Sequence, residues 1–167
     1  MARSVMFVVT FGLTIWISSN VVRSSEQEDK ALLSAMNDAK VSLQQGLIAS
    51  QREGRPISAR FEVEDGKLQL SVYTTKDGKY SEVIVDYTTG AAAKSELITE
   101  GEDLAHAKPQ TEAMSTAKID LKGAVDRAAI EVTGSRPISI VPEKKDGHSA
   151  ASVVVLKQGQ FETISQH

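Results

Sequence analysis

An internal repeat constrains the fold of this chain more than any other feature of its sequence. The tetrapeptide Arg-Pro-Ile-Ser begins at Arg55 and again at Arg136, which is 81 positions later. Over the 32 residues that begin at Arg55, 11 are identical to their counterparts at this offset, without a gap. Upstream, an offset of 78 matches a second block around Met36 and Met114. Two matching blocks in the same order predict one structural unit that occurs twice.

Each copy predicts a helix followed by three strands. Ser42 and Asp120 are helix N-cap residue types, and Gln45 completes a capping box with Ser42. Apolar and polar residues then alternate over residues 57–64, as in a half-buried strand, and Asp65-Gly66 is a hairpin turn. We therefore expect an α+β fold, a tandem repeat of a helix followed by a three-stranded antiparallel β-meander, with the helix covering the apolar face. Whether the two meanders share one sheet stays open.

The first 24 residues have the pattern of a secretory signal peptide. Arg3 precedes an uncharged run, Val5–Ile17, and small polar residues follow. Cleavage fits after Ser24 or after Ser19, and the alternative is an uncleaved N-terminal membrane anchor. Both alternatives place the rest of the chain outside the cytoplasm, so we expect a periplasmic or secreted protein.

The repeat and the leader together divide the chain into four segments. We expect a signal peptide at 1–24, a first module at 25–91, a connector at 92–112 and a second module at 113–167. The connector is polar and contains Pro109, and its first residues, Ala92 to Leu97, are expected to form a short helical piece. Residues 25–38 are also expected to be helical.

Five motifs of the first copy carry a resemblance to a known family. They are Ser-Leu-x-x-Gly at Ser42–Gly46, the corner Gly54–Ala59, the turn Glu64–Lys67, the dipeptide Val72-Tyr73, and the closing segment Val83–Gly90. This pattern resembles the PepSY domain family. The resemblance covers residues 31–91 in full and 113–167 less well, because Pro142 lies within a predicted strand and His167 stands where the first copy has Asp86. It implies a non-enzymatic extracytoplasmic module that binds and restrains peptidases or regulates proteins of the cell envelope, and it brings no catalytic residues.

Composition and motif searches argue against several function classes. The chain has no cysteine, which excludes disulfides, thiolate metal sites and Cys nucleophiles. Its formal net charge of −3 is unlike that of a nucleic-acid-binding protein. It contains no nucleophile elbow, Walker loop or dinucleotide fingerprint. His106, His148 and His167 are far apart in the sequence and lack close metal-ligand spacing, so we interpret them as surface residues.

Acidic side chains occur in two groups, and each group is also compatible with an ordinary solvated surface. Glu62 and Glu64 share one face of a predicted strand, and Glu143 repeats Glu62, so these residues could bind a cation or a basic partner. The outer face of a three-stranded sheet is also ordinarily polar. The connector carries a second group, which we interpret as solvated linker: Glu100, Glu102 and Asp103.

The repeated arginines are the candidate contact residues. Arg55 and Arg136 could present guanidinium groups to carboxylates of a protein partner, such as a secreted or periplasmic peptidase. An exposed sheet face or edge strand is the other candidate surface. We assign no catalytic, cofactor-binding or metal-ligating residue, and expect no enzyme activity, no cofactor, no nucleic-acid partner, and membrane contact only through a retained leader. The alternative function is a periplasmic small-ligand or metal-binding protein.

Overall fold

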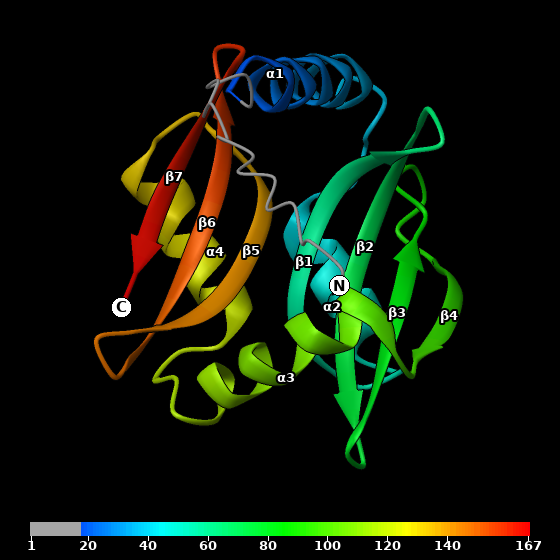
Figure 1. Cartoon of the computed structure of the whole chain (residues 1–167), viewed down its shortest axis with the longest axis vertical. Helices are drawn as coiled ribbons and strands as arrows, with labels where there is room; N and C mark the ends of the chain where they lie inside the picture. Colours follow the sequence, from blue (N-terminus) through cyan, green and yellow to red (C-terminus); the bar gives the residue numbers. More distant parts are fainter. Residues whose placement is uncertain (1–17) are drawn as a thin grey trace, which may run out of the picture.

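Four helices and one seven-stranded antiparallel sheet make up the described part of the chain, residues 18–167 of a computed structural model (Figure 1). In chain order the elements are α1 (Ser18–Ala35), α2 (Leu43–Ser50), β1 (Arg55–Glu64), β2 (Lys67–Lys76), β3 (Lys79–Val85), β4 (Ala92–Ile98), α3 (Gly101–Ser115), α4 (Leu121–Glu131), β5 (Arg136–Lys145), β6 (His148–Lys157) and β7 (Gln160–Gln166). The predicted α+β class is confirmed. Most of the predicted leader, residues 1–17, lies outside the described residues. In the part described, no helix is long and apolar enough to cross a membrane.

All seven strands belong to a single sheet with the order β4-β3-β2-β1-β5-β6-β7. Strands β1 to β4 and strands β5 to β7 each form a meander of antiparallel neighbours. The two meanders join where β1 pairs with β5, at Ala59 with Ile140 and Arg60 with Ser139. Ala59 and Ile140 are themselves 81 positions apart, so each residue of this pair faces its own counterpart at the offset of the repeat.

The helices cover both faces of this sheet. Helices α2 and α4 lie behind the sheet in Figure 1, and α3 lies in front of it. The main core between the sheet and the two rear helices contains the largest fully buried apolar side chains, among them Leu43, Leu70, Val72, Val83, Val125, Ile140, Val153 and Val155. A smaller core of Ile57, Tyr73 and Ala107 lies under α3 on the opposite face. Because neighbouring residues of a strand point to opposite faces, Val72 and Tyr73 belong to different cores.

Local signals in the sequence set the helix starts and the hairpins. The Ser42 Oγ accepts a hydrogen bond from the Gln45 N–H at 3.2 Å, and the Gln45 side chain accepts one from the Ser42 N–H at 2.7 Å. Asp120 caps α4 by accepting from the N–H of Gly123 at 2.7 Å. The Asp65-Gly66 turn has φ values of +49° and +75°, the left-handed conformation that such hairpin turns require. The predicted capping box, N-caps and hairpin turn are therefore confirmed.

The helical piece expected at 92–97 is wrong, because residues Ala92–Ile98 form strand β4. The chain turns at Gly90, whose φ is +77°, and runs back beside β3 with Ser95 opposite Val83. The unpaired edge of β3 offers backbone partners along the whole segment, and this pairing outweighs the helical preference of its alanines. The rest of the expected connector begins α3, a helix that contains Pro109.

Candidate functional site

The centre of the molecule is the short junction between β1 and β5. Only two residue pairs join these strands, and on both sides of the junction the strands curve apart (Figure 1). Helix α3 packs against both strands on one side of the junction, and α1 lies across the opposite end of the sheet and packs against β1. The groups around this junction are the first candidates for a binding site.

Arg136 is the first residue of β5, three residues before the junction, and its guanidinium donates hydrogen bonds within the chain. Nη1 donates to the carbonyl of Met36 at 3.0 Å, and Nη2 donates to the carbonyls of Ala39 at 2.7 Å and Val41 at 3.0 Å. The guanidinium carbon also lies 5.7 Å from the centre of the Phe61 ring, within cation–π distance. Burial lowers the pKa of Arg136, but arginine stays protonated under all ordinary conditions. Arg136 therefore ties the second half of the chain to the segment that leads into α2.

Arg55 makes the corresponding contact in the other direction. Its Nη2 donates to the carbonyl of Met114 at 3.1 Å, and Met114 is the counterpart of Met36 at the 78-residue offset. Each repeated arginine thus reaches a backbone carbonyl of the other half. Contact between a partner and Arg55 or Arg136 stays a prediction, and Arg55, which is exposed and makes one such bond, has more donors free for it.

A buried polar cluster lies between the sheet and α3. Ser58 Oγ donates to Gln110 Oε1 at 2.8 Å, and both side chains are buried. The hydroxyl of Tyr73 donates to the carboxylate of Asp103 in the first turn of α3. Burial, and then the hydrogen bond to Asp103, raise the pKa of Tyr73. The sequence interpretation missed this cluster and placed Asp103 in a solvated linker, because only the fold brings α3 over β2.

Glu82 lies on the outer face of the sheet, which is the face that carries Tyr73, its cross-strand neighbour on β2. Burial raises the pKa of Glu82, and the negative charges of Glu62, Asp103 and Glu64 raise it further. Its cross-strand neighbour on β4 is Glu96, a further carboxylate. The outer face therefore disfavours a charged Glu82 in the folded chain.

We expect Glu82→Gln to stabilise the protein at pH 7 by about 0.2–1 kcal/mol, the range for removing a like-charge cross-strand pair. A raised pKa means that the folded state holds the proton of Glu82 more tightly than the unfolded state does. The stability of the native protein therefore falls as the pH rises through this pKa, and the advantage of the variant disappears in acid. Urea unfolding at pH 7 and pH 4 measures this difference, with the exposed Glu53→Gln as control; a gain that persists at pH 4 contradicts the assignment.

The predicted acidic residues of the strands are held by serines of the adjacent strand. Ser71 Oγ donates to Glu62 Oε1 at 2.7 Å, and Ser152 Oγ donates to Glu143 Oε1 at 2.7 Å. Glu62 also forms an ion pair with Arg60 at 2.8 Å. Among the residues that the structure describes, no three His, Asp or Glu side chains converge as metal ligands would. These acids can instead offer charge to a basic group.

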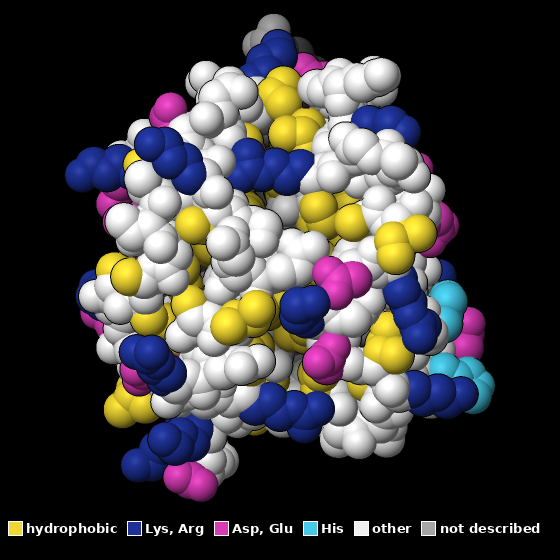
Figure 2. Space-filling model, turned by 180° about the vertical axis from the view of Figure 1, so that it is seen from behind, with side chains coloured by type: hydrophobic (Ala, Val, Ile, Leu, Met, Phe, Trp, Pro, Cys, Tyr) yellow, Lys and Arg dark blue, Asp and Glu magenta, His cyan; other side chains and the backbone are white. Residues whose placement is uncertain are grey.

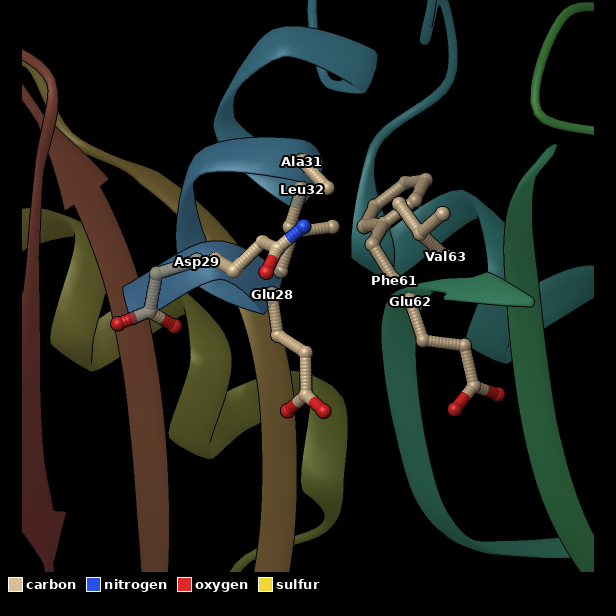
Figure 3. A pocket seen from close by; sticks show the side chains of 8 residues that line it. Glu28, Asp29, Ala31, Leu32, Phe61, Glu62 and Val63 are labelled. Atoms are coloured by element: carbon tan, nitrogen blue, oxygen red, sulfur yellow. The ribbon is translucent and has the colours of Figure 1, made fainter. Parts of the chain in front are cut away.

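A hollow of about 520 Å³ lies between α1 and β1 (Figure 3). Leu32 of α1 and Phe61 of β1 form its apolar walls. The carboxylates of Glu28 and Glu62 extend in the same direction from the two sides of the hollow. An apolar wall with two carboxylates suits a ligand that carries a cationic group.

A second hollow, of about 630 Å³, lies at the hairpin between β5 and β6. It is lined by three lysines and two histidines: Lys118, Lys144, Lys145, His148 and His167. Figure 2 shows histidine side chains beside Lys and Arg side chains at one edge of the molecule. His148 and His167 are both exposed, as expected of surface residues, and the pairing of β6 with β7 brings them to the same hollow.

No protein-family model, no curated protein and no solved structure matches this chain. What it binds is therefore inferred from its own residues and their arrangement.

Proposed function

We propose that this chain is a non-enzymatic, extracytoplasmic binding module, similar to PepSY domains, that acts through contact with a protein partner. The partner class is a secreted or periplasmic peptidase, or another protein of the cell envelope. The observation that carries the proposal is the exposed edge of the sheet at β4.

Strand β4 ends the sheet and pairs only with β3 among the described residues. Every residue of β4 except Ile98 is exposed, and the side chain of Leu97 is 64% exposed. An edge strand can accept an extended segment of a partner through backbone hydrogen bonds, and exposed apolar side chains add specificity. Lys94 and Glu96, which form an ion pair at 2.8 Å, offer both charges beside this edge.

The proposal includes a tandem origin for the two halves, each a helix followed by a three-stranded meander. Three correspondences at the 81-residue offset support it. The first strand of each half has a bulge after its proline, at Pro56 and at Pro137. The first hairpin of each half has an aspartate with positive φ, at Asp65 and at Asp146. The third is the pair of Ser–Glu hydrogen bonds described above.

The alternative is a protein that binds a small ligand, and the hollow of Figure 3 favours it. Glu28, Glu62 and the apolar walls would hold a small organic cation there. A melting screen with organic amines and divalent metal ions tests this alternative, since a ligand that binds only the folded state raises the melting temperature.

Capture from an envelope extract of the host tests the protein-partner proposal. We expect the immobilised full chain to retain a peptidase or an envelope protein, identified by mass spectrometry. Leu97→Lys should abolish this capture, because it places a charge in the apolar part of the edge. Ile130→Lys is the matched control, since Ile130 on α4 is 76% exposed and lies away from β4.

Both lysine variants should keep the circular dichroism spectrum and melting temperature of the native chain, because each replaces an exposed side chain. Capture that survives Leu97→Lys, or that is lost equally with Ile130→Lys, would count against binding at the β4 edge.

A further inference from the structure

Strand β4 ends the sheet, and its side chains are exposed on both faces. Figure 1 shows β4 at the margin of the sheet, and among the described elements only β3 pairs with it. Residues 92–97 are all exposed. A bulge at Ala93 interrupts the pairing with β3, whereas residues 94–98 pair with it regularly. This regular part presents backbone donors and acceptors to a further strand.

The strand carries opposite charges two residues apart on one face. Glu96 lies opposite Glu82 of β3 on the outer face of the sheet, and Lys94 shares this face with Glu96. Ser95, between them, lies on the other face, opposite Val83 of the main core. Charges on an edge strand discourage pairing with strands whose charges do not match. This edge therefore favours a strand with a carboxylate opposite Lys94 and a cation opposite Glu96.

A second molecule of this chain supplies that pattern when two β4 strands pair antiparallel about a twofold axis. Residues opposite each other in a sheet lie on the same face, so the axis passes through a residue and not between two residues. Centred on Ser95, this register places Lys94 of each molecule opposite Glu96 of the other. Centred on Lys94 or on Glu96, it places like charges opposite each other, which destabilises a sheet. Charge therefore selects the register centred on Ser95.

The length of the strand and its exposed leucine favour the same register. Ser95 is the middle residue of β4, so a register centred on it brings the two strands alongside each other over their full length. Leu97, which is 64% exposed in the single chain, then lies next to Ala93 of the second molecule. This contact covers an apolar side chain that the chain itself leaves in water.

The same register supplies a counter-charge to a pair of carboxylates. Within one molecule, Glu96 lies opposite Glu82 on β3 and forms an ion pair with Lys94 of its own strand at 2.8 Å. Lys94 of the second molecule lies directly opposite Glu96 on the side away from β3. The row of side chains across the sheet then places two lysines around Glu96, which offsets the repulsion between Glu96 and Glu82.

We propose that two molecules of this chain associate through their β4 strands into one continuous antiparallel sheet, with Ser95 on the twofold axis. One short strand from each molecule is a small contact beside the roughly 20–30 residues a side of a stable interface, so we expect a dissociation constant on the order of 10 µM. The inference rests on the proposed function in one respect, because both use the free edge of β4. The second molecule and the envelope partner therefore exclude each other.

A disulfide reports this register directly, because the native chain has no cysteine. In the proposed dimer the two Ser95 residues are directly opposite each other, with Cα atoms about 4.5–5.5 Å apart, which a disulfide can span. Mild oxidation of the full chain should therefore link Ser95→Cys into a covalent dimer, seen by non-reducing electrophoresis. Leu97→Cys is the matched control. It is also exposed and lies on the same face of the same strand, but its two copies would be about 14 Å apart and should not link.

Charge reversal tests the register independently, by sedimentation equilibrium of the full chain. Lys94→Glu and Glu96→Lys each place like charges opposite each other twice in the dimer, and each should weaken association by about tenfold. An equimolar mixture of the two variants should associate as the native chain does, because every charged pair between the molecules is then Glu with Lys. The ion pair within each chain stays broken in the mixture, so it cannot explain the recovery. The circular dichroism spectrum of each variant shows that it is folded.

Two results would overturn the inference: Leu97→Cys that links as readily as Ser95→Cys, or a mixture of the charge variants that associates no better than each variant alone. The proposed function fails separately. The linked Ser95→Cys dimer should capture no envelope partner, and reduction should restore capture. If the linked dimer still captures its partner, the edge proposal falls and the self-association stands. If Leu97→Lys abolishes capture but the native chain forms no dimer, the edge proposal stands and this inference falls.

Discussion

Arg136→Met should lower the free energy of unfolding by about 3 kcal/mol, whereas Arg55→Met should lower it by about 1 kcal/mol. Arg136 donates to three backbone carbonyls and is partly buried, but Arg55 is exposed and donates to one. A carbonyl that loses its donor in a partly buried place costs about 1 kcal/mol or more, and charged donors are the stronger ones. Methionine keeps most of the length and apolar area of the arginine stem, so the difference reports the hydrogen bonds together with the contact between the Arg136 guanidinium and the Phe61 ring.

Urea unfolding followed by circular dichroism measures the loss of unfolding free energy in both variants. Arg55→Met serves as the control for Arg136→Met, because the two arginines occupy matching positions of the two halves. Arg136→Lys should give an intermediate loss, since an ammonium keeps the charge but cannot reach three carbonyls with the same planar geometry. Equal losses at the two positions would show that the internal contacts of Arg136 contribute little to stability. Arg136 would then be as free to serve a partner as Arg55 is.

Those parts of the fold that depend on neighbouring residues were predictable from the sequence. The capping box depends only on the first turn of a helix, because Ser42 and Gln45 are three positions apart. The Asp65-Gly66 turn depends only on its own two residues. Strand alternation after Arg55 also follows from local pattern. Each of these features is short-range, so no knowledge of distant contacts was required.

Long-range features were outside the reach of the same reasoning. The single sheet depends on two residue pairs between β1 and β5, and no local pattern marks Ala59 or Ile140 as a junction. Strand β4 forms because β3 has a free edge, although its alanine-rich start favours a helix.

The candidate sites were only partly accessible for the same reason. The repeat marks Arg55 and Arg136 as candidate contact residues. A repeated residue can, however, make contacts between the two halves as readily as contacts with a partner, and these two arginines do contact the other half. The hollow with His148 and His167 does have a signal in the sequence. Lysines replace Val63 and Glu64 at the matching positions of the second half, Lys144 and Lys145. Differences between the copies, rather than their identities, indicated this site.

Gly46→Ala and Leu70→Ala should each destabilise the protein, and the double variant should lose less than the sum. A Cβ atom at Gly46 would lie 2.6 Å from Cδ2 of Leu70, so this fully buried side chain would have to move. We expect Gly46→Ala to cost about 1–3 kcal/mol through overpacking, although alanine is the better helix former. Leu70→Ala alone should cost about 2–5 kcal/mol because it leaves a cavity.

The second half of the chain shows why the two changes compensate each other. Its residues at the matching positions are Ala124 and Ala151, so the same helix and strand pack there with two small side chains. In the double variant the new methyl group at position 46 occupies part of the space that Leu70 leaves, and we expect an interaction of about 1–2 kcal/mol in a double-mutant cycle measured by urea unfolding. A control cycle of Leu70→Ala with the exposed Ile130→Ala should be additive within about 0.5 kcal/mol. If the first cycle is equally additive, Gly46 is not kept small by Leu70, and the close approach of α2 to β2 must be maintained by other contacts.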